Sequence, residues 1–202
     1  MSLDRITATL ATVPWKEIPC LTGSSEHVPA AVIGLATADA EAVRAEMYWL
    51  LENRIVVQGG LFESAFYTVP FLIALLHEPD TRGKQHIYDL LFEIGNGGAS
   101  YTQVVRPRHR SVPFSHFTPD ADGPSIPVQV ACRSAVVCGI AMYVRDVGSD
   151  NALLHEKSLE LISSFTGFGC VVRSALETRM RCCMDLTAST RASIMRVINA
   201  AT

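Results

Sequence analysis

Apolar residues recur along most of the chain at spacings of three and four, which is typical of amphipathic α-helices. Alternation of period two is scarce, apart from residues 101–105. The pattern predicts an all-α protein in which a short helix over residues 3–12 precedes four pairs of helices. We expect these pairs at 25–37 and 39–54, 62–78 and 80–95, 126–146 and 150–165, and 169–183 and 186–200.

The helix pairs share an internal repeat. Val28-Pro29 and Val69-Pro70 begin two similar apolar segments, and the two prolines lie 41 positions apart. A third copy begins at Ile126-Pro127. We expect each proline in the first turn of its helix, where the missing N–H removes no hydrogen bond.

An aspartate precedes the second helix of the first three pairs: Asp39, Asp80 and Asp150. An aspartate carboxylate can accept hydrogen bonds from the backbone N–H groups of the next turn, so we expect all three to be N-caps. Helical hairpins that repeat every 40 to 47 residues or so are typical of the HEAT and armadillo classes. The sequence therefore predicts a HEAT/armadillo-like α-solenoid of about four hairpins, as a single domain over residues 1–202.

An irregular insertion at about residues 95–125 separates the second pair from the third. It is rich in glycine and proline, and it is longer than an ordinary connection between helices. A loop of this length either has a function or merely joins the two pairs, and both interpretations remain open.

Two stretches of the chain resemble a known group of proteins. Gln58-Gly59-Gly60 and Val69-Pro70-Phe71-Leu72 resemble the repeat core of uncharacterised bacterial HEAT-repeat domain-containing proteins, and the run at 131–135 is similar to their second half. The resemblance spans about residues 15–165. It implies an interaction scaffold, with some relatives in toxin–immunity settings, and it implies no catalytic residues.

The net charge of −3 is unevenly distributed. Residues 1–95 carry a balance of −6, whereas residues 167–202 carry a balance of +3. An acidic first half does not suit nucleic-acid binding over the whole surface. It favours a basic protein partner through electrostatic complementarity, although a solvated helical surface gives the same composition.

In a solenoid, the second helices tend to line one continuous concave surface. Tyr48 and Trp49 lie among carboxylates on the first of these helices, which is a common hot-spot composition, although Trp49 could instead close the hairpin junction. We expect a non-catalytic protein-interaction module with an acidic concave face, in its most specific form an immunity or antagonist protein. The predicted partner-binding residues are Arg44, Tyr48, Glu52, Gln58, Asp89 and Glu93.

A nucleic-acid-associated HEAT-like domain is the alternative. It would use arginines of the insertion and of the last helix pair. No aromatic residue interleaves the C-terminal arginines, so stacking on bases is not indicated. The residues assigned to this alternative are Arg106, Arg108, Arg110, Arg179 and Arg181.

The sequence predicts no enzyme, cofactor or metal site. His109 and His116, even with Ser115 and Cys132, match neither an i, i+4 helical pair nor a zinc-binding spacing. The six cysteines contain no C-x-x-C pair and are expected to be free thiols, most of them in the core. We see neither a signal peptide nor a membrane span, so we expect a cytoplasmic protein.

Overall fold

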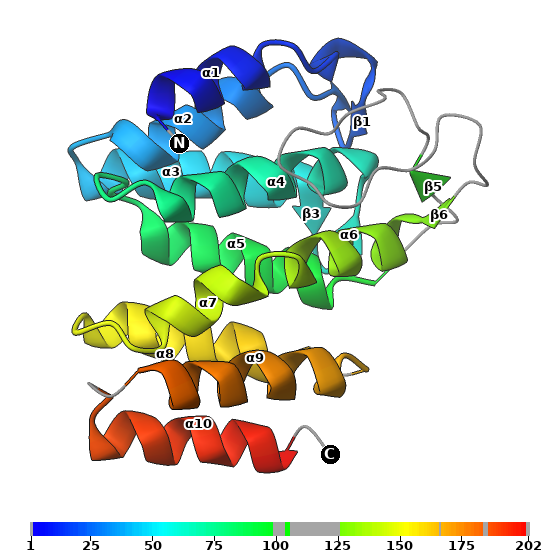
Figure 1. The fold of residues 1–202 in the computed structure, drawn as a ribbon. Helices are drawn as coiled ribbons and strands as arrows, with labels where there is room; N and C mark the ends of the chain where they lie inside the picture. The colour runs from blue at the N-terminus through cyan, green and yellow to red at the C-terminus, as the bar shows by residue number, and fades with distance from the viewer. Residues whose placement is uncertain (1, 99–103, 106–125, 166, 184–185, 201–202) are drawn as a thin grey trace. The chain divides into compact units, whose positions relative to one another are not determined.

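The computed structural model describes residues 2–98, 104–105, 126–165, 167–183 and 186–200 (Figure 1). These residues form ten α-helices, one short 3₁₀ helix and three two-stranded hairpins. The all-α prediction is confirmed. Close packing divides the chain into two compact units, Met1–Cys138 and Gly139–Thr202.

The first unit contains six of the helices and all three hairpins. Its elements are α1 (Leu3–Leu10), η1 (Trp15–Glu17), β1 (Pro19–Cys20), β2 (Gly23–Ser24), α2 (Val28–Thr37), α3 (Glu41–Ile55), β3 (Val56–Val57), β4 (Gly60–Leu61), α4 (Glu63–His77), α5 (Lys84–Asn96), β5 (Val104–Val105), β6 (Ile126–Pro127) and α6 (Val128–Val137). The second unit consists of α7 (Ile140–Asp146), α8 (Ala152–Ser163), α9 (Gly169–Cys182) and α10 (Ala188–Ala200).

Most of the predicted helices lie within a few residues of the observed ones. The exception is the helix expected over 126–146, which is interrupted at Cys138 and Gly139 and forms the separate helices α6 and α7. Gly139 leaves the helical conformation there, with φ −80° and ψ 2°. Glycine has little helix propensity, so a break at this residue is physically reasonable.

Helix α4 forms the centre of the first unit. It is buried along almost its whole length, and it packs against α1, α2, α3, α5 and α6. A helix that is apolar on every side belongs in a core, which is why this segment shows little amphipathicity. Its largest buried side chains are the aromatic rings of Phe66, Tyr67 and Phe71.

The repeated prolines occupy three different places. Pro29 lies in the first turn of α2, as expected. The expectation is wrong for Pro70, which lies inside α4, because this helix begins earlier at Glu63. It is also wrong for Pro127, which ends β6 immediately before α6. Pro70 has no backbone N–H to donate to the carbonyl group four residues earlier in α4.

Each two-stranded hairpin directly precedes the first helix of a pair. β1–β2 precedes α2, β3–β4 precedes α4 and β5–β6 precedes α6, and all three hairpins are antiparallel. In β3–β4 the turn residues Gln58 and Gly59 have φ of 49° and 75°, the positive values that a type I′ turn requires. Residues 106–125 connect β5 to β6, so most of the predicted insertion belongs to a hairpin and lies outside the described residues.

The first two predicted N-caps are wrong. Helix α3 is preceded by Ala40, with no side-chain cap, and Asp39 Oδ1 lies 2.6 Å from Arg82 Nη1. Helix α5 begins after Gly83, so Asp80 lies in the preceding turn, exposed to solvent. Asp39 forms an ion pair that connects two repeats, which no single-repeat pattern could indicate.

The third predicted N-cap is wrong by one residue. The cap of α8 is Asn151, whose Oδ1 accepts hydrogen bonds from the N–H groups of Leu153 at 3.1 Å and Leu154 at 3.3 Å. Asparagine and aspartate cap helices about equally well. The sequence Asp150-Asn151 therefore gave two adjacent candidates of similar strength.

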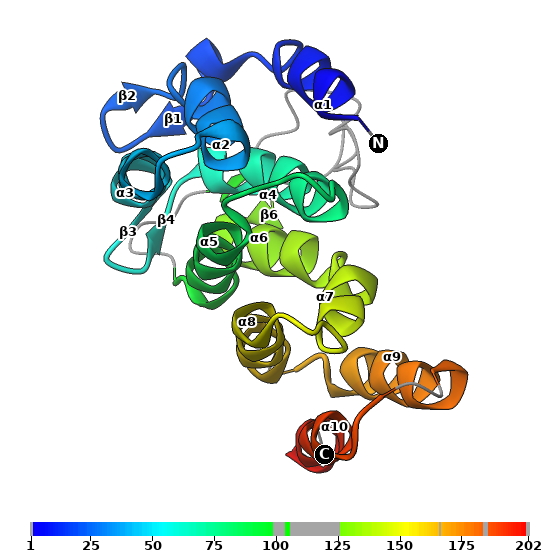
Figure 2. The ribbon, with the colours of Figure 1, turned by 90° about the vertical axis from the view of Figure 1, so that its left-hand side faces the viewer.

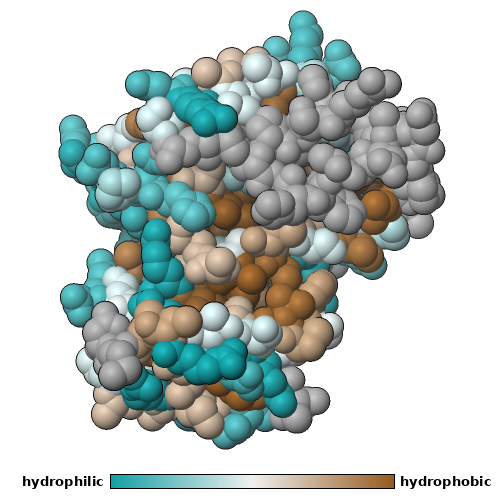
Figure 3. Space-filling view, viewed as in Figure 1, coloured by the Kyte–Doolittle hydropathy of each residue, from teal (hydrophilic) through white to brown (hydrophobic). Residues whose placement is uncertain are grey.

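The second unit is built from four helices. α7 packs against α8 and α9, and α10 packs against α9 and α8. Tyr143, Leu161, Leu176 and Ile194 supply buried side chains to its core. Apolar and polar side chains alternate over the visible surface of these helices (Figure 3).

Candidate functional site

The second helices of the first two pairs, α3 and α5, lie side by side within the first unit (Figure 2). The predicted partner-binding residues on these two helices are all half-buried and recur at helical spacing. We call this surface the α3–α5 face. It consists of Glu41, Arg44, Tyr48, Trp49 and Glu52 on α3 and His86, Asp89 and Glu93 on α5.

Opposite charges meet at the N-terminal end of the α3–α5 face. His86 Nε2 lies 2.7 Å from Glu41 Oε1, and Gln85 Nε2 donates to the same oxygen at 3.3 Å. Hydrogen bonds from His86 and Arg44 lower the pKa of the Glu41 carboxyl. This end of the α3–α5 face is therefore electrostatically satisfied within the protein itself.

Arg44 directs its guanidinium inward. Nη1 donates to the carbonyl oxygens of Ala38 at 2.7 Å and Asp39 at 2.8 Å, which fixes the connection between α2 and α3. Nε and Nη2 donate to Glu41 Oε2 at 3.0 and 2.5 Å. These bonds give Arg44 a structural role, and its contact with a partner stays a prediction.

Aromatic rings occupy the middle of the α3–α5 face. The ring centroid of Tyr48 lies 5.6 Å from that of His86 and 5.3 Å from that of Trp49, which it meets edge to face. Tyr48 is half-buried, whereas Trp49 is 57% exposed. An indole with this exposure does not fill a hairpin junction, so it remains accessible to solvent or to a partner.

Like charges meet at the C-terminal end of the α3–α5 face. Burial raises the pKa of the Glu52 carboxyl, and the negative charge of Glu93 raises it further. Glu52 Oε2 is buried and has no hydrogen-bond partner among the described residues. Both glutamates lie in the last turns of their helices, where the helix dipole also disfavours negative charge.

No cation neutralises these two carboxylates within the described part of the chain. Arg54, in the same turn of α3, instead donates from Nη1 to Thr22 Oγ1 at 3.3 Å, next to the β1–β2 hairpin. The C-terminal end of the α3–α5 face therefore combines two carboxylates with two helix C-termini, and the described residues supply no counter-charge to it.

Gln58 follows α3 after the short strand β3. It occupies the exposed β3–β4 turn with φ 49°, a left-handed conformation that costs a residue other than glycine about 1–2 kcal/mol. Local backbone strain of this kind is often found at functional positions. Its role as a partner contact stays a prediction.

The arginines of the nucleic-acid alternative are only partly described. Arg106, Arg108 and Arg110 lie outside the described residues. Arg179 Nη1 donates to Cys183 Sγ, so this side chain is directed toward the end of its own helix, α9. Arg181 is exposed, with Nη2 3.5 Å from Thr178 Oγ1.

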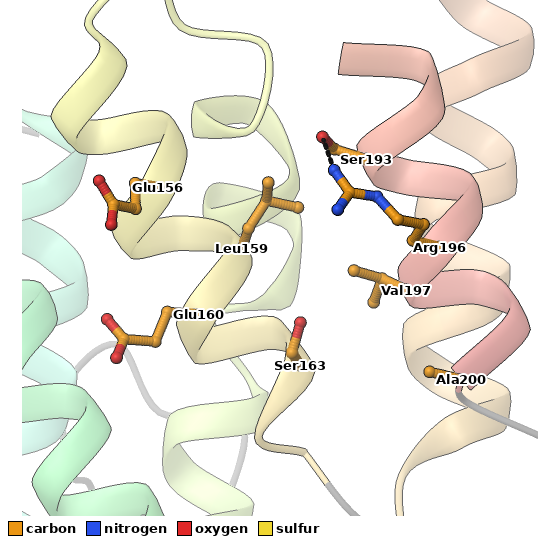
Figure 4. Close-up of a pocket in the computed structure, with 8 residues that line it drawn as sticks. All are labelled: Glu156, Leu159, Glu160, Ser163, Ser193, Arg196, Val197 and Ala200. Atoms are coloured by element: carbon orange, nitrogen blue, oxygen red, sulfur yellow. Dashed lines mark hydrogen bonds between the residues drawn. The ribbon is translucent and has the colours of Figure 1, made fainter. Parts of the chain in front are cut away.

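A separate groove lies between α8 and α10 in the second unit (Figure 4). It has a volume of about 530 Å³. Glu156 and Glu160 extend from α8 away from α10, and Arg196 donates to Ser193 Oγ at 3.0 Å. No acid–base pair converges among the described residues that line the groove. Its lining residues are Glu156, Leu159, Glu160, Ser163, Ser193, Arg196, Val197 and Ala200.

Other chemistry receives little support within the described ranges. No group of three or more His, Cys, Asp or Glu side chains there could hold a metal ion. Cys132 is buried, and burial raises the pKa of its thiol, so the reactive thiolate is disfavoured. His109, Ser115 and His116 lie outside these ranges. No single described helix is both long and apolar enough to cross a membrane. The bent pair α6 and α7, taken together, has sufficient length and apolar composition for a span.

Comparisons with protein-family models and with curated proteins gave no match. The sequence-based candidates include Glu52 and Glu93 but not Glu41 and His86, which the structure pairs on the same face. One signal was present: His86 lies seven residues before Glu93, two turns earlier on the same stripe of α5.

Proposed function

We propose that this chain is a non-catalytic, HEAT-like repeat domain that binds a basic protein through the α3–α5 face. The half-buried Glu52 carboxylate carries this proposal, because its Oε2 has no hydrogen-bond partner among the described residues and the negative charge of Glu93 acts on it from α5. Two carboxylates that find no counter-charge among the described residues give the α3–α5 face a complementary surface for a positively charged partner. The acidic balance of residues 1–95 would steer such a partner toward it.

The HEAT-like part of the proposal rests on the order of the elements. Hairpin, first helix and second helix follow one another twice, as β1–β2, α2, α3 and as β3–β4, α4, α5. The second helices α3 and α5 are neighbours, as stacked repeats require. In its most specific form, the domain is an immunity or antagonist protein that neutralises a basic partner, as the family resemblance suggests.

Charge reversal tests the proposed surface. We expect the purified domain to retain a stoichiometric basic protein from a lysate of its source cells at low and moderate salt after nuclease treatment. Glu52→Lys combined with Glu93→Lys should abolish this retention, because it inverts the charge where the partner binds. The control, Glu156→Lys with Glu177→Lys, changes the net charge equally at exposed positions of the second unit and should leave retention intact.

Three results would count against the proposal. Retention that is unchanged in the Glu52→Lys/Glu93→Lys variant would exclude the α3–α5 face as the binding surface. Retention that disappears with nuclease would instead favour the nucleic-acid alternative. Equal loss in both double variants would show that only net charge matters. Circular dichroism of both double variants must show intact helical content.

A further inference from the structure

The α3–α5 face contains one complete charge–aromatic cluster and one incomplete cluster. In the complete one, the Tyr48 ring lies against the His86 ring, and His86 pairs with the Glu41 carboxylate. An aromatic ring, a ring that can carry positive charge and a carboxylate are thus assembled from two repeats. The protein satisfies this cluster with its own residues.

The incomplete cluster lies one turn further along α3. Trp49 supplies an exposed aromatic ring, and its side chain makes no hydrogen bond within the described residues. Glu52 is three positions later on α3 and therefore adjacent to Trp49 on the helix surface. Glu93 adds a second carboxylate from α5. An aromatic face and two carboxylates are present, and the described residues supply no cation to them.

We propose that an arginine side chain of the protein partner completes this cluster, stacking on Trp49 and pairing with Glu52 and Glu93. This inference rests on the proposed function and specifies the chemistry of the partner. A guanidinium suits the cluster because it is planar: its face can stack on an indole while its edge donates paired hydrogen bonds to a carboxylate. A lysine ammonium can approach either group but lacks this combination of a flat face and a donor edge.

Two peptides of equal charge separate arginine recognition from general charge attraction. We would measure the binding of nona-arginine and nona-lysine to the intact chain by isothermal titration calorimetry at low salt. The wild-type chain should bind nona-arginine about five- to tenfold more tightly, the range expected for one well-formed cation–π contact. Raising the salt concentration should weaken the binding of both peptides but preserve the preference for nona-arginine.

Substitutions at Trp49 test whether its ring causes the preference for nona-arginine. Trp49→Leu keeps an apolar side chain without an aromatic face, so the affinities for the two peptides should become equal within about twofold. Trp49→Phe should restore part of the difference, because phenylalanine offers a weaker aromatic face. The matched control is Leu21→Ala, another exposed apolar residue of the first unit, which should retain the full preference.

Each outcome has a distinct meaning. Equal binding of both peptides by the wild type, or a preference for arginine that survives Trp49→Leu, overturns the arginine inference and leaves the proposed acidic surface standing. Binding of both peptides that is unaffected by Glu52→Lys with Glu93→Lys overturns the proposed surface as well. If neither peptide binds at low salt, both are overturned.

Discussion

Replacing Glu52 by glutamine should stabilise the first unit at neutral pH. At pH 7 the Glu52 carboxylate faces the charge of Glu93 and the C-terminal end of α3. Glutamine keeps the size of the side chain and removes its charge. Relief of a like-charge contact contributes about 0.2–0.5 kcal/mol. Removal of a negative charge from the C-terminal end of a helix contributes about 0.3–1 kcal/mol. We therefore expect a gain of about 1 kcal/mol.

The gain should depend on pH in a defined direction. The pKa of Glu52 in the folded protein is raised above its ordinary value of 4.5, so the folded state binds the proton more readily than the unfolded state. The charged form therefore lowers stability at pH 7, and this penalty disappears as the pH falls through the folded-state pKa. The advantage of glutamine should be largest at pH 7 and close to zero below about pH 4.5.

Tryptophan fluorescence gives a suitable assay, because both tryptophans, Trp15 and Trp49, belong to the first unit. The free energy of unfolding would be measured in urea at several pH values for the wild type and Glu52→Gln. Glu46→Gln makes the same chemical change at an exposed position of α3 and should alter stability by less than about 0.5 kcal/mol. A Glu52→Gln variant that is no more stable at pH 7, or whose gain is independent of pH, would refute the electrostatic argument.

Three further predictions concern the backbone. Gly83→Ala should lower the free energy of unfolding by about 1–3 kcal/mol in the fluorescence assay, because its Cβ would lie 2.3 Å from the Leu35 carbonyl oxygen. An unchanged free energy of unfolding would contradict this close approach of Gly83 to the Leu35 carbonyl group. Asn151→Ala should lower the free energy of unfolding by about 1 kcal/mol and speed hydrogen exchange in the first turn of α8, whereas Asp150→Ala should have little effect on either. A larger effect of Asp150→Ala than of Asn151→Ala would show that Asp150 is the cap. Gln58→Gly should raise the free energy of unfolding by up to about 1 kcal/mol in the same assay, since glycine adopts the positive φ without strain. A loss of stability would indicate that the glutamine side chain stabilises the folded chain.

The sequence predicted most of the helices well because apolar residues recur at helical spacing along them, although α4 is buried on almost every side and has no single apolar stripe. It missed the three hairpins because strands of two residues are too short to show alternation. It misplaced the cap at Asp39 because the decisive partner, Arg82, belongs to the next repeat. Local patterns contain no information about a contact between side chains so far apart along the chain.

The candidate site could be predicted in part for a related reason. Glu52 and Glu93 occupy equivalent positions of two copies of the repeat, and equivalent positions of adjacent helices become neighbours. The orientation of Arg44 could not be predicted, because it depends on two carbonyl groups exposed by the turn before α3. Sequence spacing locates residues on a face, but it does not show which way a long side chain extends.

The hairpins offer a route for engineering this fold. β3–β4 closes with a turn centred on Gln58 and Gly59, whereas the equivalent β5–β6 contains residues 106–125 between its strands. Closing a connection ten times longer costs only about 2 kcal/mol of chain entropy. The tip of β3–β4 should therefore accept a grafted epitope or a reporter domain while α4 and its neighbours keep their packing.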